Sequence, residues 1–364
     1  MEEPEDELVK PPAVRRHPGR GAGLNTSNRF TELSVELDPS ELTEVDLRER
    51  TTYFEDRSRS VISTNNSPDI GFDASINPYR GCEHGCSYCY ARPTHEYLGL
   101  SAGLDFERKI FVKRDAAALL RERLESRGWQ PRTLMLSGVT DPYQPVERRL
   151  RISRSLLEVL ARYRNPASVI TKNALVTRDI DLLGSMAAWN GISVTLSITT
   201  LDEGLRARLE PRTSTIANRL SAIRQLSSVG VPVGVNMAPI IPGLTDHEIA
   251  DVLEAAADAG ASHANFTIVR LPHAVAELFE EWLEANVPLR KTRILKRIKE
   301  AHNGRLSGLE FGKRLKGEGV HAGQIGKLFR LTRKRVGIPA TKITLDTDAF
   351  WRPGEARQDT LFEV

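Results

Sequence analysis

The sequence predicts an α/β fold with a parallel sheet, because short apolar runs alternate with amphipathic helical patterns between about residues 70 and 272. Six strand–helix units of this kind are too few for a closed eight-stranded barrel. They suit a partial, open (β/α)6 barrel or a doubly wound sheet. No GxGxxG or GxxxxGK[ST] pattern stands at a strand–helix junction, so a nucleotide-phosphate fold has no sequence support.

The strands and helices alternate in a regular order. The predicted strands are Ala74–Tyr79, Thr133–Gly138, Ser168–Lys172, Ser193–Ile198, Val231–Ile240 and Ala264–Val269. The predicted helices are 116–126, Ser153–Tyr163, Asp179–Trp189, Thr215–Ser228 and Asp246–Ala259, with Asp115 as a possible cap of the first and Gly230 and Gly260 at expected C-caps. The run Lys109–Lys113 is ambiguous, and Lys342–Leu345 is a final strand candidate.

The two ends of the chain differ from this central pattern. Residues 1–65 are rich in charged residues, Pro, Ser and Thr without sustained periodicity, which predicts a disordered charged tail. We expect the barrel over residues 66–272 and a mainly helical, basic extension over residues 273–364. Its stretches 290–299 and 327–335 are dense in Lys and Arg, with apolar residues at helical spacing. Each stretch is either a solvated helix face or a surface that contacts phosphate groups.

The composition is that of a soluble globular protein. The 364 residues are 40% hydrophobic and 27% charged, and the net charge of +3 says little about partners. No run of about 18 apolar residues exists, so no membrane-spanning helix is expected. The acidic N-terminus lacks the order of a secretion signal, and we therefore expect a cytoplasmic location.

The three cysteines lie within eight residues of one another and carry the most specific signal. Cys82, Cys86 and Cys89 have the spacing C-x3-C-x2-C and come directly after the first predicted strand. Three thiolates on one loop can hold three irons of a [4Fe–4S] cubane and leave the fourth iron open for a ligand. The alternative is a Cys3His zinc site with His84, in a zinc-dependent nucleic-acid-binding module without catalysis. His84 stands between two cysteines, which makes that geometry crowded.

This motif, with an aromatic residue before its third cysteine, resembles the signature of the radical S-adenosylmethionine (SAM) superfamily. The resemblance implies a partial (β/α)6 barrel, one [4Fe–4S] cluster and SAM bound to the open iron. It implies that one electron, from a reductant protein such as flavodoxin or ferredoxin, cleaves SAM to methionine and a 5′-deoxyadenosyl radical. That radical abstracts hydrogen from a substrate, which is unidentified here and could be a nucleic acid.

Residues 72–272 are more closely similar to the branch that contains spore photoproduct lyase. Tyr88 and Tyr90, on either side of Cys89, resemble the tyrosines of that cluster loop and are the candidate catalytic residues. The resemblance implies that Lys172 meets the SAM carboxylate, that Ser197 lies near the ribose, and that Ala238 lies against the adenine. Ammonium, hydroxyl and apolar groups suit these three parts of SAM.

In the loop after the second strand, residues 137–145, the resemblance implies one more contact with SAM. The same loop also differs from that of spore photoproduct lyase at one position. Thr140 is the expected neighbour of the SAM amino group, and Asp141 either caps a helix or fixes the loop. Tyr143 and Gln144 are candidates for lining a substrate pocket. Spore photoproduct lyase returns hydrogen from a cysteine in this loop, where Gly138 stands here. The chain has no fourth cysteine, so neither repair by that route nor an auxiliary cluster is expected.

Overall fold

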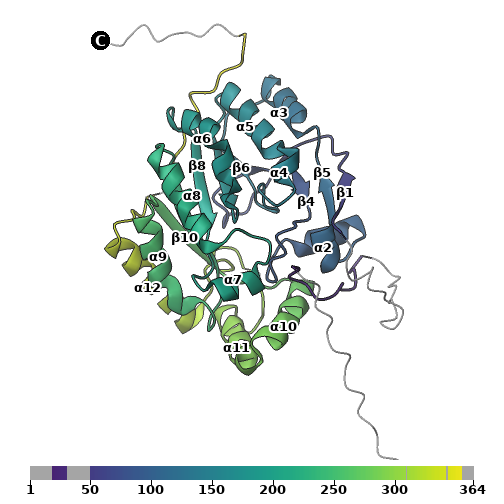
Figure 1. The fold of residues 1–364 in the computed structure, drawn as a ribbon, viewed down its shortest axis with the longest axis vertical. Helices are drawn as coiled ribbons and strands as arrows, with labels where there is room; N and C mark the ends of the chain where they lie inside the picture. The colour runs from purple at the N-terminus through teal and green to yellow at the C-terminus, as the bar shows by residue number, and fades with distance from the viewer. Residues whose placement is uncertain (1–18, 31–49, 309, 342, 355–364) are drawn as a thin grey trace, which may run out of the picture.

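A twisted sheet of seven strands forms the centre of the molecule. The computed structural model describes residues 19–30, 50–308, 310–341 and 343–354 (Figure 1). The strand order is β10–β9–β8–β7–β6–β3–β2. These strands are β2 (Ile62–Thr64), β3 (Ala74–Ile76), β6 (Leu134–Leu136), β7 (Ala167–Thr171), β8 (Ile192–Ser197), β9 (Val233–Ile240) and β10 (His263–Ile268). The last six are parallel to their neighbours, and β2 is antiparallel at the edge. The α/β fold with an open, partial (β/α)6 barrel is therefore confirmed.

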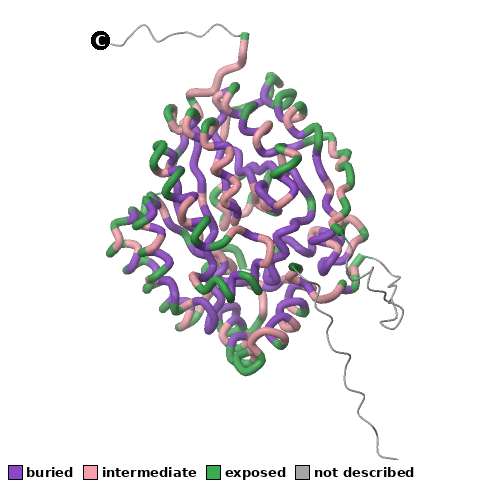
Figure 2. The backbone as a smooth tube through the Cα atoms, in the orientation of Figure 1, coloured by how far each residue is buried: buried purple, intermediate pink, exposed green. Residues whose placement is uncertain are grey.

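A continuous layer of helices covers the outer face of this sheet (Figure 1). In the order in which neighbours pack, they are α3 (Ala116–Glu125), α5 (Ile152–Arg162), α6 (Ile180–Ala187), α8 (Ile216–Ser228), α9 (Ile249–Asp258) and α12 (Gly319–Arg335). Val169, Val194 and Val233 lie in register on neighbouring strands and are almost completely buried in the core. Figure 2 shows the strands buried along most of their length, with exposed residues concentrated on the helices.

The opposite face of the sheet carries polar side chains at alternate positions. The hydroxyls of Ser168 and Ser193 lie 2.8 Å apart, and Thr195 Oγ1 lies 3.0 Å from His263 Nε2. Because successive side chains of a strand point to opposite faces, these residues cannot share the apolar helix side. The inner face of the open barrel is thus a polar surface suited to a polar ligand.

A three-stranded sheet stands beside the barrel, with two of its strands before the cysteine motif in sequence and one after it. It consists of β1 (Thr52–Glu55), β5 (Lys109–Val112) and β4 (Tyr79–Arg80), in that order. The ambiguous run Lys109–Lys113 is therefore a strand. The single predicted strand Ala74–Tyr79 is wrong, because it is divided between the two sheets. Pro78 interrupts it, since proline has no N–H to donate to a ladder, and its carbonyl accepts from the Lys113 N–H at 3.0 Å.

The described parts of the N-terminal segment are ordered. The prediction of a disordered tail over residues 1–65 is wrong for residues 19–30 and 50–65; residues 1–18 and 31–49 lie outside the described residues. The N–H groups of Gly21 and Ala22 donate to the Glu107 carboxylate at 3.1 and 2.9 Å. The Thr26 N–H donates to Ser101 Oγ at 2.7 Å. Backbone N–H groups therefore hold the first of these segments by donating to side chains. Such contacts require no apolar periodicity, so the sequence pattern did not indicate them.

Two smaller expectations at element ends also fail. Asp115 makes no side-chain cap to α3; its φ and ψ of −87° and 11° lie outside the extended region that an N-cap residue adopts. Residues 343–345 form no strand, and Lys342 lies outside the described residues. Here the Thr344 carbonyl accepts from the Asn190 side chain at 3.0 Å, which ties the segment to the end of α6. The expectation that Gly230 and Gly260 end helices is confirmed, because their φ values of +79° and +95° are those of the left-handed glycine at a helix C-terminus.

Helices follow the last parallel strand, as expected for the C-terminal extension. They are α10 (Ala274–Asn286), the 3-10 turn η4 (Pro288–Arg290), α11 (Lys291–Ala301) and α12. In Figure 1, α10 and α11 lie together at one end of the molecule. No helix in the described ranges is long and apolar enough to cross a membrane.

The remaining elements are short and lie in the connections. They are η1 (Arg92–Leu98), α2 (Leu104–Arg108), α4 (Glu147–Leu150), η2 (Ala174–Asp179), α7 (Glu203–Leu209) and η3 (Asp246–Glu248). Several of them support the cysteine loop or the residues around it.

Candidate functional site

One buried arginine holds the cysteine loop through a backbone carbonyl. Arg92, at the start of η1, donates from Nε and Nη2 to the Cys86 carbonyl at 3.1 and 2.9 Å. The same guanidinium forms an ion pair of 2.5 Å with Glu107 of α2. Both side chains are completely buried. Cys82 is fixed separately, because its N–H donates to the Phe106 carbonyl at 2.9 Å.

Gln144 and Glu83 hold the other side of the loop. The Gln144 side chain donates to the Gly81 carbonyl at 3.2 Å and accepts from the Glu83 N–H at 2.9 Å. The Glu83 carboxylate accepts from the Val146 N–H at 2.7 Å. Gln144 is completely buried. Tyr143 is also completely buried, and its hydroxyl donates to Asp179 at 3.0 Å. The expectation that these two residues line a substrate pocket is therefore wrong; Gln144 supports the cysteine loop.

Two glycines allow the loop to turn tightly against the N-terminal segment. Gly85 has a φ of +67°, which disfavours residues with a side chain. A Cβ on Gly21 would lie only 1.6 Å from the Gly85 carbonyl oxygen. The segment around Gly21 therefore covers the loop at van der Waals contact.

The three thiols fit a metal cluster by their burial. Cys82 and Cys86 are each 8% exposed. Desolvation raises the pKa of all three thiols, so their thiolates require positive charge, which bound iron supplies. In the described part of the chain, no three His, Cys, Asp or Glu side chains are close enough to share one metal ion. A cubane does not require such a group, because each thiolate binds a different iron.

Both ring nitrogens of His84 are engaged by other polar side chains. Its Nδ1 lies 3.3 Å from Asp141 Oδ2, and its Nε2 lies 3.4 Å from Asn173 Nδ2. Both ring nitrogens thus face polar groups of the loops that follow β6 and β7. This arrangement disfavours the Cys3His zinc site considered above.

Asp141 fixes its own loop to the end of β7. Its carboxylate accepts from Thr171 Oγ1 at 2.7 Å and from the Lys172 N–H at 2.8 Å. Burial alone would raise the pKa of Asp141, but His84 and these hydrogen bonds lower it. Of the two roles considered for Asp141, loop fixation is the one observed, and it determines where Lys172 leaves the strand.

A buried charge network surrounds Glu210, which directly follows α7. Its carboxylate accepts from Lys172 Nζ at 3.0 Å, from Arg219 Nη2 at 2.6 Å and from Thr199 Oγ1 at 2.7 Å. The Tyr88 hydroxyl also donates to it. Burial opposes ionisation of Glu210, but Arg219 and Lys172 lower its pKa. The network therefore holds one carboxylate between two cations.

Four of the predicted site residues meet around this network. Lys172 Nζ donates to the Ala238 carbonyl at 3.0 Å, and Arg219 Nη1 donates to the Ser197 carbonyl at 2.8 Å. Tyr88 is linked to Lys172 through Glu210. These residues come from the cysteine loop and from the carboxyl ends of β7, β8 and β9, where parallel α/β folds place ligands.

Thr140 and Tyr90 lie apart from the network and close to Gly138. Thr140 Oγ1 donates to the Tyr79 carbonyl at 2.8 Å and is buried. The Tyr90 hydroxyl donates to the Gly138 carbonyl at 2.6 Å, and the Arg270 guanidinium lies 4.9 Å from the centre of its ring. Tyr90 is 46% exposed, whereas Tyr88 is buried. The two tyrosines thus occupy very different environments.

The sequence analysis missed Glu210, Arg219 and Thr199. Glu210 follows a helix of seven residues, too short for its apolar pattern to stand out. The available signal was Asp202, which caps α7 by accepting from the Leu205 N–H at 2.9 Å. No sequence spacing relates Arg219, on α8, to this carboxylate.

The family comparison agrees with the fold and with the cysteine loop. The model of the Radical SAM superfamily matches residues 76–256. This part of the chain belongs to the radical SAM superfamily. The matched radical SAM segment begins at the end of β3 and continues into α9, and it includes all three cysteines and the Glu210 network.

Two of the relatives found by sequence are uncharacterized proteins. The uncharacterized protein Rv2578c of Mycobacterium tuberculosis (strain H37Rv) is 36% identical over 220 residues, 60% of this chain and 65% of its own length. The uncharacterized protein MJ0683 of Methanocaldococcus jannaschii is 30% identical over 173 residues, 48% of this chain and 62% of its own length. The chain thus matches slightly less than two thirds of the length of these relatives.

Structural similarity extends beyond the matched radical SAM segment. Spore photoproduct lyase complexed with dinucleoside spore photoproduct has a TM-score of 0.59 at 18% identity, covering 84% of this chain and 85% of the lyase. A lyase mutant with bound AdoMet and the same photoproduct has a TM-score of 0.57 with equal coverage. At this identity, the likeness concerns the fold.

We predict that Glu210→Gln lowers the free energy of unfolding by about 3–5 kcal/mol, because the neutral amide leaves the buried guanidinium of Arg219 without a counter-charge and Lys172 without its ion-pair partner. Denaturant unfolding of the purified protein measures this loss. Glu122→Gln, on the exposed face of α3, is the matched control and should change stability by less than about 0.5 kcal/mol. Equal stability of the two variants would contradict the role given to the network.

Proposed function

We propose that this protein is a radical SAM enzyme that binds one [4Fe–4S] cluster and reductively cleaves SAM to act on a substrate not yet identified. The observation that carries the proposal is the position of three cysteines, two buried and one partly buried, on one braced loop beside the ion pair of partly buried Lys172 with buried Glu210. Both lie within the radical SAM segment.

Cys82, Cys86 and Cys89 would hold three irons and leave the fourth open to the amino and carboxylate groups of SAM. When bound, the cluster supplies one electron to SAM, whose cleavage gives methionine and the 5′-deoxyadenosyl radical that takes hydrogen from the substrate. The electron comes from a reductant, for which a protein such as flavodoxin or ferredoxin is suited. Arg92 keeps the loop in shape, because it binds the Cys86 carbonyl and not a thiol.

Lys172 is the proposed partner of the SAM carboxylate. An ammonium has three donors. Two of them bond to Glu210 and Ala238 at 3.0 Å, and the third makes a longer contact of 3.4 Å with Thr199. An incoming carboxylate would replace this weakest contact. Glu210 would hold the ammonium of Lys172 in this orientation.

Three further residues are proposed to complete the SAM site. The Thr140 hydroxyl already donates to the Tyr79 carbonyl, so its oxygen remains able to accept from the SAM ammonium. Ser197 would contact the ribose, and Ala238 would lie against the adenine. Asn236 supports a polar ligand beside them: it pairs with Ser197 in the sheet, and its Oδ1 is buried with no partner among the described residues.

Tyr90 is the better placed of the two tyrosines to meet a substrate radical. It is half exposed and lies against Gly138, at the position where the lyase family has its hydrogen-donating cysteine. Tyr88 is buried, and its hydroxyl is bound to Glu210. We therefore assign Tyr88 to positioning within the network and Tyr90 to the side of the site that faces the substrate.

Cys86→Ala is predicted to abolish the intact cluster, because the chain has no spare thiolate to replace it. Iron and sulfide analysis after anaerobic reconstitution, together with visible absorption, measures the loss. Full iron content and continued formation of 5′-deoxyadenosine with dithionite would overturn the cluster assignment. The wild-type protein should also bleach in air, because an open iron is accessible to oxidants.

Lys172→Ala should weaken SAM binding about ten- to hundredfold, as expected when a charge-assisted hydrogen bond worth about 1.5–3 kcal/mol is lost. Equilibrium binding of SAM to the reconstituted protein measures this effect, with iron content as the check on cluster integrity. Lys296→Ala removes an exposed ammonium from α11 and is the control. A SAM affinity within twofold of wild type would exclude Lys172 from the site.

The reconstituted protein is predicted not to repair dinucleoside spore photoproduct efficiently. Gly138 occupies the hydrogen-donor position, and the only three thiols of the chain are proposed cluster ligands. Chromatography of the thymidine products after incubation with SAM and dithionite provides the test. Rapid repair over many turnovers would instead identify the photoproduct as a substrate and would require a donor other than cysteine.

A further inference from the structure

Helix α11 has one apolar side and one basic side. Ile294, Ile298 and Ala301 are buried, whereas Arg293, Lys296 and Lys299 are exposed. Ile294 and Ile298 belong to the same apolar cluster as Cys86 and Tyr88. The basic side therefore faces outward from a helix whose inner side packs toward the radical SAM site.

A surface pocket of about 390 Å³ lies where the beginning of α11 meets the loop after β9. Its walls are Gly243, Asp246, His247, Arg290, Arg293 and Arg297. The pocket thus brings three guanidinium groups, one from η4 and two from α11, against a loop that contributes a single carboxylate.

The positive charges of this pocket exceed the negative charge available to them. Asp246 accepts from the Gly243 N–H at 2.9 Å and from His321 Nε2 at 3.0 Å, and lies 3.6 Å from Arg297 Nη1. Its carboxylate is thus already shared among several groups. Arg290 Nη2 is bound to the Gly243 carbonyl at 2.6 Å, which is a neutral acceptor. Neither Arg290 nor Arg293 forms an ion pair with any described residue.

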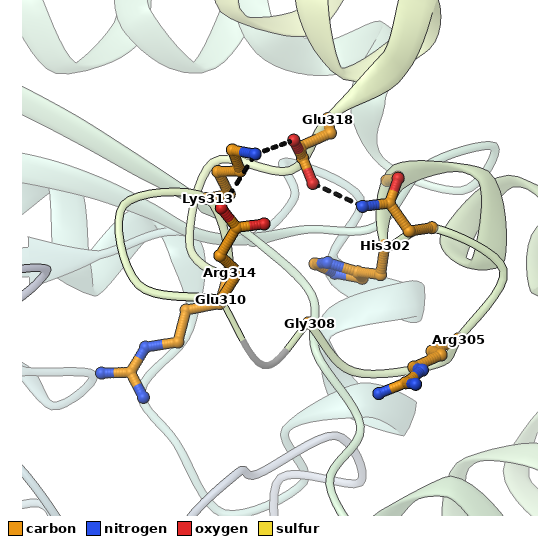
Figure 3. Close-up of a pocket in the computed structure, with 9 residues that line it drawn as sticks. His302, Arg305, Gly308, Glu310, Lys313, Arg314 and Glu318 are labelled. Atoms are coloured by element: carbon orange, nitrogen blue, oxygen red, sulfur yellow. Dashed lines mark hydrogen bonds and ion pairs between the residues drawn. The ribbon is translucent and has the colours of Figure 1, made fainter.

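A second pocket provides the contrast. It measures about 260 Å³ and lies between the end of α11 and residues 310–318. Lys313 of this pocket is paired with Glu310 and Glu318, each at 2.9 Å, and Figure 3 shows these side chains together. Arg314, in the same wall, is paired with Asp69 at 2.5 Å. Lys313 and Arg314 are thus paired with carboxylates within the protein, whereas Arg290 and Arg293 of the first pocket are not paired with one in the described part of the chain.

We propose that the pocket of Arg290, Arg293 and Arg297 is a binding site for a phosphate group, separate from the radical SAM site. A planar guanidinium group can donate two parallel N–H···O hydrogen bonds to one phosphate, and three guanidinium groups can surround one phosphate. The bond of Arg290 to Gly243 and the contact of Arg297 with Asp246 hold two guanidinium groups in place before a ligand arrives. The phosphate could belong to a mononucleotide or to a nucleic-acid backbone, and Lys296 and Lys299 continue the basic surface along α11.

The test compares wild type, Arg293→Gln and the double variant Arg293→Gln/Arg297→Gln with the control Arg224→Gln, an exposed arginine on α8. Binding of inorganic phosphate and adenosine 5′-monophosphate is measured by calorimetry. Binding of a labelled 12-nucleotide single strand is measured by fluorescence anisotropy, at constant ionic strength. Arg293→Gln should weaken binding about tenfold and the double variant still more. The control should stay within twofold.

The probes distinguish the source of the phosphate. Binding of the two small probes, lost in the pocket variants, supports a site for a free or mononucleotide phosphate. Binding of the oligonucleotide alone, lost in the same variants and weakened by salt, supports a site for a nucleic-acid backbone. Absence of binding by all three probes, or equal loss in Arg224→Gln, would overturn the proposal. Unchanged thermal unfolding of the variants serves as the check that they are folded.

Discussion

The buried ion pair between Arg92 and Glu107 is the contact on which the geometry of the cysteine loop depends. Arg92 donates hydrogen bonds to the Cys86 carbonyl of the loop, and the Glu107 carboxylate accepts from the N–H groups of Gly21 and Ala22. Removing one partner of such a pair costs about 3–5 kcal/mol, because the other is left as an uncompensated buried charge. Three segments that are distant in sequence are therefore fixed relative to one another by two side chains.

The sheet has an apolar outer face and a polar inner face, and the candidate site lies on the polar side. Its outer face packs Val169, Val194 and Val233 against helices. Its inner face carries hydroxyl and amide groups, and at the carboxyl ends of β7 to β9 the chain adds the ions of the Glu210 network. The two cations keep the buried carboxylate of Glu210 ionised by lowering its pKa, which an apolar pocket could not do. A site that has to hold a zwitterionic ligand such as SAM benefits from this arrangement.

The parts of the structure that repeat could be predicted from the sequence, and the parts that depend on single contacts could not. Apolar runs predicted the positions of all six parallel strands, although the first of them ends at Ile76 and not at Tyr79, and the spacing of Cys82, Cys86 and Cys89 predicted the loop. Lys172 was expected at a strand end from a resemblance, but its partner Glu210 follows a helix too short to leave a pattern. The ordered segment around Gly21 was missed for a similar reason, since backbone N–H groups hold it and every residue except proline has one.

The contact between Gly21 and Gly85 has a practical meaning for anyone who prepares this protein. Charged, proline-rich leading segments are commonly removed before crystallisation or spectroscopy. Here a version that starts after residue 30 would lose two donors to Glu107 and the backbone that covers Gly85. The cysteine loop would then be open to solvent on one side. A shortened chain could fold well and still give a misleading picture of how readily oxygen reaches its thiols.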